Sequence, residues 1–102
     1  MTTLVELIPA LLEKSIEGKI DWEQLSSTSF IASIGELVVE VSKVSDTVVR
    51  LRRDSLVIES VAYTTTRAPT DGMIVQLYEI ARRKGLRVDE TLNSLKNALD
   101  SL

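Results

Sequence analysis

The chain has 102 residues, of which 44% are hydrophobic and 26% are charged, and its formal net charge at pH 7 is −3. This length and composition fit a folded chain with one core, so we expect residues 1–102 to form a single domain. The chain contains no cysteine and no histidine. These absences exclude a disulfide framework, thiolate or imidazole metal sites and the usual hydrolase triads, and we expect neither a metal nor a cofactor.

Charge and hydropathy also limit where the chain acts. Charged or turn residues interrupt every apolar stretch before the roughly 18 to 20 residues that a bilayer span needs, so we expect no membrane association. The first residues lack the basic start and apolar run of a secretory signal. Together with the missing cysteines, these features predict a cytoplasmic protein. The acidic balance disfavours a nucleic-acid partner.

An amphipathic helix is predicted at the start of the chain. Thr3 and Glu6 have the spacing of a capping box, and Gly18 is placed to end the helix. Pro9 lacks an amide donor, so the helix either kinks or begins there. The next segment, up to the hydroxyl-rich residues 26–29, is interpreted as a connection. The apolar residues of the helix recur at steps of three and four: Leu4, Leu7, Ile8, Leu11, Leu12 and Ile16.

β-branched residues with a period near two then predict an antiparallel meander of four strands. The strands are Phe30–Ile34, Leu37–Lys43, Thr47–Arg52 and Leu56–Tyr63.

The turns between these strands predict the register. A type II′ turn at Gly35-Glu36 pairs Phe30 with Val41, Ala32 with Val39 and Ile34 with Leu37. A three-residue loop at 44–46 pairs Val41 with Val49 and Val39 with Leu51. A turn at Arg53-Asp54 would pair Leu51 with Leu56 and Val49 with Ile58. All three hairpins then share one apolar face.

The opposite face of the predicted sheet is mixed in character. In this register Glu40 lies across from Arg50, and Val48 lies across from Glu59. Glu40 and Glu59 could form a catalytic pair of carboxylates, but Arg50 between them favours a salt-bridged surface. We interpret six residues near this face as candidates for binding a partner: Val38, Val48, Arg50, Arg52, Val57 and Tyr63.

Two further helices are predicted after a loop at 64–71. Thr70 or Asp71 caps the first, which ends at Gly85 and can pair Glu79 with Arg83. Its buried stripe consists of Met73, Ile74, Leu77, Tyr78 and Ala81. Asp89 caps the last helix, whose apolar residues are Leu92, Leu95, Leu99 and Leu102. The predicted fold is therefore a two-layer α+β domain in the order α-β-β-β-β-α-α, with three helices on one face of the sheet.

Two basic clusters are candidates for anion binding, one at residues 50–53 and one at residues 82–87. If they form a single patch with Arg67, they favour a nucleic-acid or nucleotide accessory factor. The alternative is solvated surface and helix capping. The candidate residues outside the strand face are Arg53, Arg67, Arg82, Arg83 and Arg87. Trp22, between Ile20 and Leu25, is predicted to pack in the core.

Segments 11–22, 30–34 and 77–82 resemble small uncharacterised bacterial α+β domains. The resemblance covers most of the chain and rests on Gly18-Lys19-Ile20-Asp21-Trp22, the meander and the Leu77-Tyr78-Glu79-Ile80-Ala81-Arg82 helix. It implies an arrangement of helix, meander and later helices, with no established activity and no functional residue to carry over. The chain departs from the pattern at Arg53-Asp54, where a turn containing glycine is expected.

These observations predict a non-catalytic protein-interaction or accessory domain. The apolar groups left outside one core predict a protein partner or self-association, through the mixed sheet face or the last helix. A nucleic-acid accessory role is the first alternative. An enzyme with a carboxylate or lysine site is the second.

Overall fold

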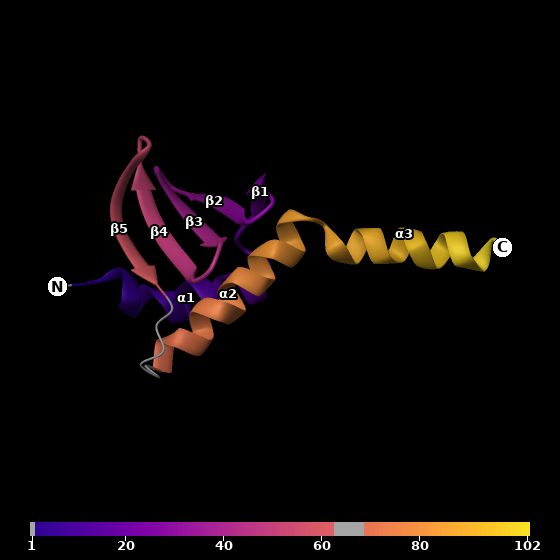
Figure 1. The fold of residues 1–102 in the computed structure, drawn as a ribbon, viewed down its shortest axis with the longest axis horizontal. Coiled ribbons are helices and arrows are strands. Elements are labelled where there is room, and N and C mark those ends of the chain that lie inside the picture. Colours follow the sequence, from indigo (N-terminus) through magenta and orange to yellow (C-terminus); the bar gives the residue numbers. More distant parts are fainter. Residues whose placement is uncertain (1, 63–68) are drawn as a thin grey trace.

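The computed structural model describes residues 2–62 and 69–102, which contain five antiparallel strands and three helices. The strands form one sheet in the order β1-β2-β3-β4-β5, with α1 and α2 on one side of it (Figure 1). The α+β class agrees with the prediction, although the sheet has one strand more than expected. The elements are α1 (Leu4–Ile16), β1 (Glu23–Ser26), β2 (Ser29–Ile34), β3 (Leu37–Lys43), β4 (Thr47–Arg53), β5 (Leu56–Ala62), α2 (Pro69–Gly85) and α3 (Val88–Asp100).

The first helix begins where the capping box places it. The hydroxyl oxygen of Thr3 accepts a hydrogen bond of 3.4 Å from the amide of Glu6, which satisfies one of the free donors of the first turn. Pro9 lies inside the helix, so a start at Pro9 is wrong. Gly18, with φ of +78°, adopts the left-handed conformation just beyond the helix end.

Residues 23–26, predicted to be part of a connection, form strand β1 instead. It is an edge strand that pairs with β2 through Glu23 with Ile31 and Gln24 with Phe30, and its register shifts at Leu25. All four of its residues are exposed. An exposed edge strand is held by backbone hydrogen bonds, so it lacks the apolar alternation by which strands are predicted.

The registers of the two central hairpins are confirmed. Phe30 lies opposite Val41, and Val39 lies opposite Leu51, with Gly35 at a φ of +62° in the first turn. Four of the residues on this face, Phe30, Val39, Val41 and Val49, are almost completely buried. They pack against Ile8, Ile74, Leu77 and Ala81 from the two helices to form one core.

The last hairpin corrects the prediction. Its turn is at Asp54-Ser55, so that Arg53 pairs with Leu56 and Arg52 with Val57. The register then shifts, and Leu51 pairs with Glu59 and Val49 with Val61. The pairings of Leu51 with Leu56, Val49 with Ile58 and Val48 with Glu59 are therefore wrong. A β-bulge adds one residue, Ile58, to β5 and turns Glu59 and Val61 to the helix side of the sheet.

Helix α2 lies across the sheet and contributes the predicted stripe. Ile74, Leu77 and Ala81 are fully buried, while Met73 and Tyr78 pack partly buried against them. The helix begins at Pro69, so a cap at Thr70 or Asp71 is wrong: both residues lie in its first turn. A proline suits this position because the first turn needs no amide donor there.

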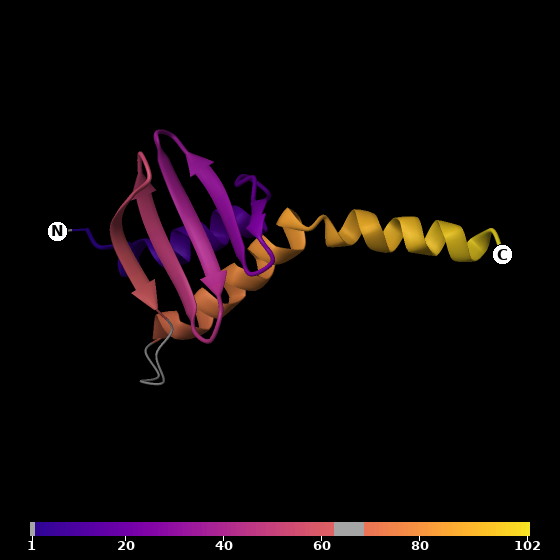
Figure 2. The same ribbon diagram turned by 45° about the horizontal axis from the view of Figure 1, so that its top comes forward.

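Helix α3 contradicts the prediction of three helices on one face. It projects away from the sheet in both views (Figures 1 and 2), and none of its residues is buried. The molecule is therefore elongated, with extents of 57 × 32 × 25 Å. Asp89 does not cap the helix: the cap position belongs to Arg87, which has a left-handed backbone. Within the described residues, no helix combines the length and apolar content needed to cross a membrane.

Candidate interaction surfaces

The apolar face of α3 is a hydrophobic surface that the rest of the fold leaves uncovered. Leu92, Leu95 and Leu99 are 52%, 54% and 58% exposed. Val88 continues this row, whose steps alternate between four and three residues. That spacing produces a narrow stripe along one side of a helix, as in helices that pack against another helix or in a groove. We call these four residues the α3 stripe.

Solvent-exposed ionic contacts lie at the junction between α2 and α3. A guanidinium nitrogen of Arg83 lies 2.8 Å from a carboxylate oxygen of Asp89, and Arg87 lies 3.9 Å from Glu90. The amide of Leu86 donates to the carbonyl of Arg82, and that of Arg87 donates to the carbonyl of Lys84. Only residues 86 and 87 separate the two helices. The junction therefore connects α3 to the domain closely while leaving its stripe in solvent.

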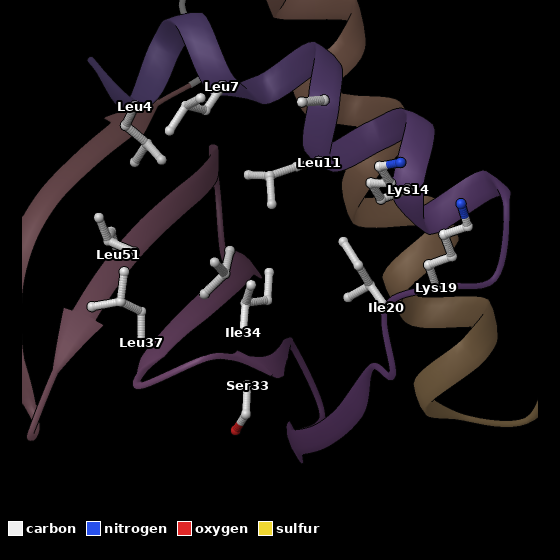
Figure 3. Close-up of a pocket in the computed structure, with 12 residues that line it drawn as sticks. Leu4, Leu7, Leu11, Lys14, Lys19, Ile20, Ser33, Ile34, Leu37 and Leu51 are labelled. Atoms are coloured by element: carbon white, nitrogen blue, oxygen red, sulfur yellow. The ribbon is translucent and has the colours of Figure 1, made fainter. Parts of the chain in front are cut away.

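A second uncovered apolar surface lies between α1 and the sheet. Leu7 and Leu11 point from α1 toward Ile34, Leu37 and Leu51 of the strands, across a gap that side chains do not fill (Figure 3). The gap has a volume of about 520 Å³. Leu7 and Ile34, at its mouth, are 44% and 40% exposed. We call it the α1–sheet groove, and it is lined by Leu4, Leu7, Ala10, Leu11, Lys14, Lys19, Ile20, Ser33, Ile34, Leu37, Val39 and Leu51.

Two lysines lie together at one end of this groove (Figure 3). The ammonium groups of Lys14 and Lys19 lie 3.7 and 3.1 Å from the same carboxylate oxygen of Glu17. Two positive charges therefore share one negative charge. Both lysine side chains are more than half exposed, so this end of the groove favours an acidic group on whatever occupies it.

The face of the sheet away from the helices brings together five of the six predicted partner-binding residues. Val38, Arg52 and Val57 lie side by side on adjacent strands, and Val48 and Arg50 follow on β4. Four of these residues are half-buried, and Val57 is exposed. Tyr63 lies outside the described residues.

Glu40 is the centre of this outer face. The side chain of Glu40 is only 8% exposed, and its carboxylate lies 3.7 Å from Arg50 and 2.6 Å from Arg52. Arg50 also donates a hydrogen bond of 2.8 Å to the hydroxyl of Ser42. A buried carboxylate needs such partners, because charge removed from water is costly unless it is paired. Glu59, the other half of the predicted carboxylate pair, lies on the opposite face of the sheet. The bulge thus separates the two acids.

The predicted anion-binding arginines do not gather in one place. Arg53 is exposed at the end of β4. Arg82 pairs with Glu79 at 2.6 Å, so the predicted partner of Glu79, Arg83, is wrong. Arg83 and Arg87 pair with acids of α3 instead. Arg67 lies outside the described residues. Arg50 and Arg52 are on the sheet face away from α2, which carries Arg82 and Arg83.

The remaining candidate, Trp22, packs in the core as predicted. Its side chain is 5% exposed, and its indole nitrogen donates a hydrogen bond of 3.0 Å to the hydroxyl of Ser15, which is fully buried. The backbone carbonyl of Ser15 in turn accepts from the ammonium of Lys84. These contacts join α1, the segment before β1 and the end of α2.

The comparisons with known proteins assign no family. The chain matches no family model, and neither the curated proteins nor the solved structures give a match. A function must therefore be argued from the surfaces themselves.

Proposed function

We propose that this protein is a non-catalytic protein-interaction domain and that α3 is its binding element. The single observation that supports the proposal is that Leu92, Leu95 and Leu99 are each more than half exposed on a helix that projects from the domain. Each leucine left in water forgoes about 1.5 to 3 kcal/mol of burial free energy. A partner that covers the stripe recovers that free energy.

The rest of the molecule is consistent with binding rather than chemistry. The chain has no histidine or cysteine, and the described residues hold no cluster of three or more acidic side chains arranged for a metal. A chain without cysteines also suits a reducing compartment such as the cytoplasm. The β-sheet and α2 serve, in this proposal, as the rigid base that presents α3.

The proposal is tested by placing one charge on the stripe. In Leu95→Glu the new carboxylate lies in the middle of the apolar row, whereas in the matched control Asn97→Glu it lies on the polar side of the same helix. The two variants and the unchanged protein are compared in two assays. Sedimentation velocity detects self-association of the purified protein, and chemical cross-linking in the producing cells detects complexes with other proteins. We expect complexes that Leu95→Glu loses and Asn97→Glu keeps. Identical behaviour of the three proteins in both assays would overturn the proposal.

A further inference from the structure

The α1–sheet groove has two apolar walls and one charged end (Figure 3). Its helix wall consists of residues that share one side of α1: Leu4, Leu7, Ala10, Leu11 and Lys14. Its volume of about 520 Å³ lies within the range of about 300 to 1,000 Å³ that is usual for small-ligand sites. Such sites are mostly apolar and contain a few polar groups that orient the ligand. The groove therefore has the size and the composition of a small-ligand site.

The polar side chains that face the groove are confined to its charged end. Of the 12 lining residues, only Lys14, Lys19 and Ser33 have polar side chains. Ser33 pairs with Val38 on the outer face of the sheet, and its hydroxyl points away from the gap (Figure 3). A peptide would bring an amide and a carbonyl with every residue, and burying these groups without partners is costly. An aliphatic chain has no polar group along its length, so it suits these walls better than a peptide does.

The charged residues of the lining are both lysines. The two nearby acids, Glu13 and Glu17, line a separate hollow on another side of α1, so neither acid is part of the groove lining. Lys14 and Lys19 contact Glu17 through a single carboxylate oxygen, and both lysine side chains are more than half exposed. Ion pairs this exposed are weak, because water screens them and the long side chains lose freedom. The ammonium groups therefore remain available to the carboxylate of a ligand.

The carbonyl end of α1, which would repel an anion, is already covered. The carbonyls of Glu13, Lys14 and Ser15 accept hydrogen bonds from the amides of residues 17–19. The ammonium of Lys84 donates a further hydrogen bond to the carbonyl of Ser15. These contacts satisfy acceptors that the end of a helix leaves free, and the charge of Lys84 offsets the negative end of the helix dipole. The helix end therefore does not cancel the attraction of the two groove lysines for an anion.

The length of the groove sets the length of its ligand. Leu4 and Lys14 are ten residues apart on α1, which is about 15 Å along the helix axis. An extended aliphatic chain advances about 1.25 Å per carbon, because its bonds are about 1.5 Å long and tetrahedral, so about twelve carbons span this length. We propose that the α1–sheet groove binds a free fatty acid, a single-chain aliphatic carboxylate of about twelve carbons, with its chain along α1 and its carboxylate at Lys14 and Lys19. This site is separate from the α3 stripe and does not depend on the proposed function.

Isothermal titration calorimetry of the full chain tests the site with dodecanoate, kept below the concentration at which it forms micelles. We expect saturable binding of one dodecanoate per chain. Hexanoate, which is six methylenes shorter, should bind at least about 100-fold more weakly, since each buried methylene contributes up to about fourfold. Dodecyltrimethylammonium has the same chain but a positive head group, and it should bind at least about fivefold more weakly than dodecanoate.

A substitution that fills the groove locates the aliphatic chain. Ala10 is exposed and lies between Leu7 and Lys14 on the helix wall, so Ala10→Trp occupies the groove from a position that is not in the core. Its matched control is Val5→Trp, which adds the same side chain at an exposed position of α1 outside the groove lining. We expect Ala10→Trp to weaken dodecanoate binding at least about tenfold and Val5→Trp to leave it within about twofold. Far-UV circular dichroism checks that both variants fold.

A second pair of variants locates the carboxylate and keeps the test valid if Ala10→Trp does not fold. Lys14→Gln/Lys19→Gln removes the charged end, and its control, Lys43→Gln/Lys96→Gln, removes two exposed lysines outside the groove. We expect the first double variant to weaken dodecanoate binding about fivefold and to lose the preference for dodecanoate over dodecyltrimethylammonium. The control should keep both the affinity and the preference.

The opposite outcomes overturn the inference. Absence of saturable dodecanoate binding, or equal affinity in Ala10→Trp and Val5→Trp, would show that the groove is not a fatty-acid site. Equal affinity for dodecanoate and dodecyltrimethylammonium would indicate adsorption of the apolar chain without recognition of a carboxylate. Loss of binding in Leu95→Glu would place the amphiphile on the α3 stripe instead. Sedimentation with vesicles of an anionic phospholipid, without binding of dodecanoate, would indicate a membrane surface as the ligand. None of these results depends on whether α3 binds a protein, so this inference and the proposed function fail separately.

Discussion

The backbone amide of Leu4 donates a hydrogen bond of 2.9 Å to a carboxylate oxygen of Glu59, 55 positions later in the chain. Leu4 is the first residue of α1, where amides have no partner within the helix and the helix dipole is positive. Glu59 reaches this amide because the bulge at Ile58 turns it to the helix side of the sheet. The contact thus joins the edge strand β5 to the start of α1, which forms one wall of the α1–sheet groove.

Removing this carboxylate should loosen the start of α1. We expect Glu59→Ala to lower the free energy of unfolding by about 1 kcal/mol, the usual value of a side-chain cap, and Glu59→Gln to lower it by less, because the amide retains an acceptor but no charge. Thermal unfolding followed by circular dichroism measures the effect, with a fall of about 4 to 8 °C expected for 1 kcal/mol. An unchanged melting temperature in Glu59→Ala would show that solvent replaces the contact without cost.

The turn between β4 and β5 stores backbone strain that a glycine would release. Asp54 and Ser55 have φ of 51° and 73°, as in a type I′ turn, and L-residues pay about 1 kcal/mol or more for this conformation. We expect Ser55→Gly to raise the free energy of unfolding by about 1 kcal/mol in urea denaturation. Ser45→Gly, in the preceding hairpin loop without a positive φ, is the control and should not raise it. An equal change in the free energy of unfolding for Ser55→Gly and Ser45→Gly would show that the turn at Asp54-Ser55 is not strained.

The same turn explains why the register of the last hairpin was predicted wrongly. Gly35 marks its own turn, and the alternation around Val39, Val41 and Val49 is regular, so two hairpins were predicted in register. Leu56, Val57 and Ile58 are consecutive apolar residues, and they give no alternation from which a register or a bulge can be deduced. The strained turn has no glycine to mark it, so the register of β5 could not be deduced from the pattern, although its start at Leu56 was predicted correctly.

The two interaction surfaces differ in how far the sequence predicts them. The spacing of Leu92, Leu95 and Leu99 predicts an apolar helix face, but periodicity gives no information about what that face contacts. The prediction placed this helix on the sheet and also named it as one of two candidate interaction surfaces, and the structure leaves its apolar face in solvent. The groove depends on the separation between α1 and β2–β4, a tertiary property, and each of its leucines individually resembles a core residue. Only Lys14 and Lys19, close in sequence beside Gly18, offered a local signal.

Gly85 is needed for space rather than for its backbone conformation. It was predicted to end α2, and the helix does end there, but the left-handed residue that follows is Arg87. A Cβ added to Gly85 would lie 2.6 Å from the ring of Phe30 and 3.4 Å from the amide nitrogen of Gln24. Phe30 is fully buried, so its ring has little room to move. The end of α2 therefore approaches the sheet more closely than any other residue type allows.

Two glycine substitutions in the same helix separate these effects. Gly85→Ala should lower the free energy of unfolding by about 1 to 3 kcal/mol, the usual cost of overpacking, in spite of the better helix propensity of alanine. Gly72→Ala, where a Cβ meets nothing within 4 Å, should raise it by up to about 1 kcal/mol. Urea denaturation of both variants measures the difference. A stabilising Gly85→Ala would mean that Phe30 can give way.

Glu79 and Arg82 form a bidentate ion pair on α2. Nε and Nη2 of Arg82 donate hydrogen bonds of 3.1 and 2.6 Å to the two carboxylate oxygens of Glu79. The hydrogen bonds from Arg82 hold the pKa of Glu79 below its ordinary value of 4.5, and Arg83 and Lys43 contribute smaller effects through their charge. A carboxylate whose pKa is lowered by folding stabilises the fold above its unfolded pKa. That stabilisation is lost as the pH falls through the lower, folded pKa.

Replacing Arg82 should return this carboxylate to ordinary behaviour. In Arg82→Gln the pKa of Glu79, followed by the NMR shift of its side-chain carboxyl carbon, should rise toward 4.5. In Arg83→Gln it should rise less, because Arg83 acts on Glu79 through its charge and pairs with Asp89 instead. The unfolding free energies of Arg82→Gln and the unchanged protein should differ at neutral pH and converge in acid, once Glu79 is protonated in both. Since half of the Glu79 side chain is exposed, solvent screens the pair and the neutral-pH difference should be small. A pKa that stays low in Arg82→Gln would assign the shift to the other cations.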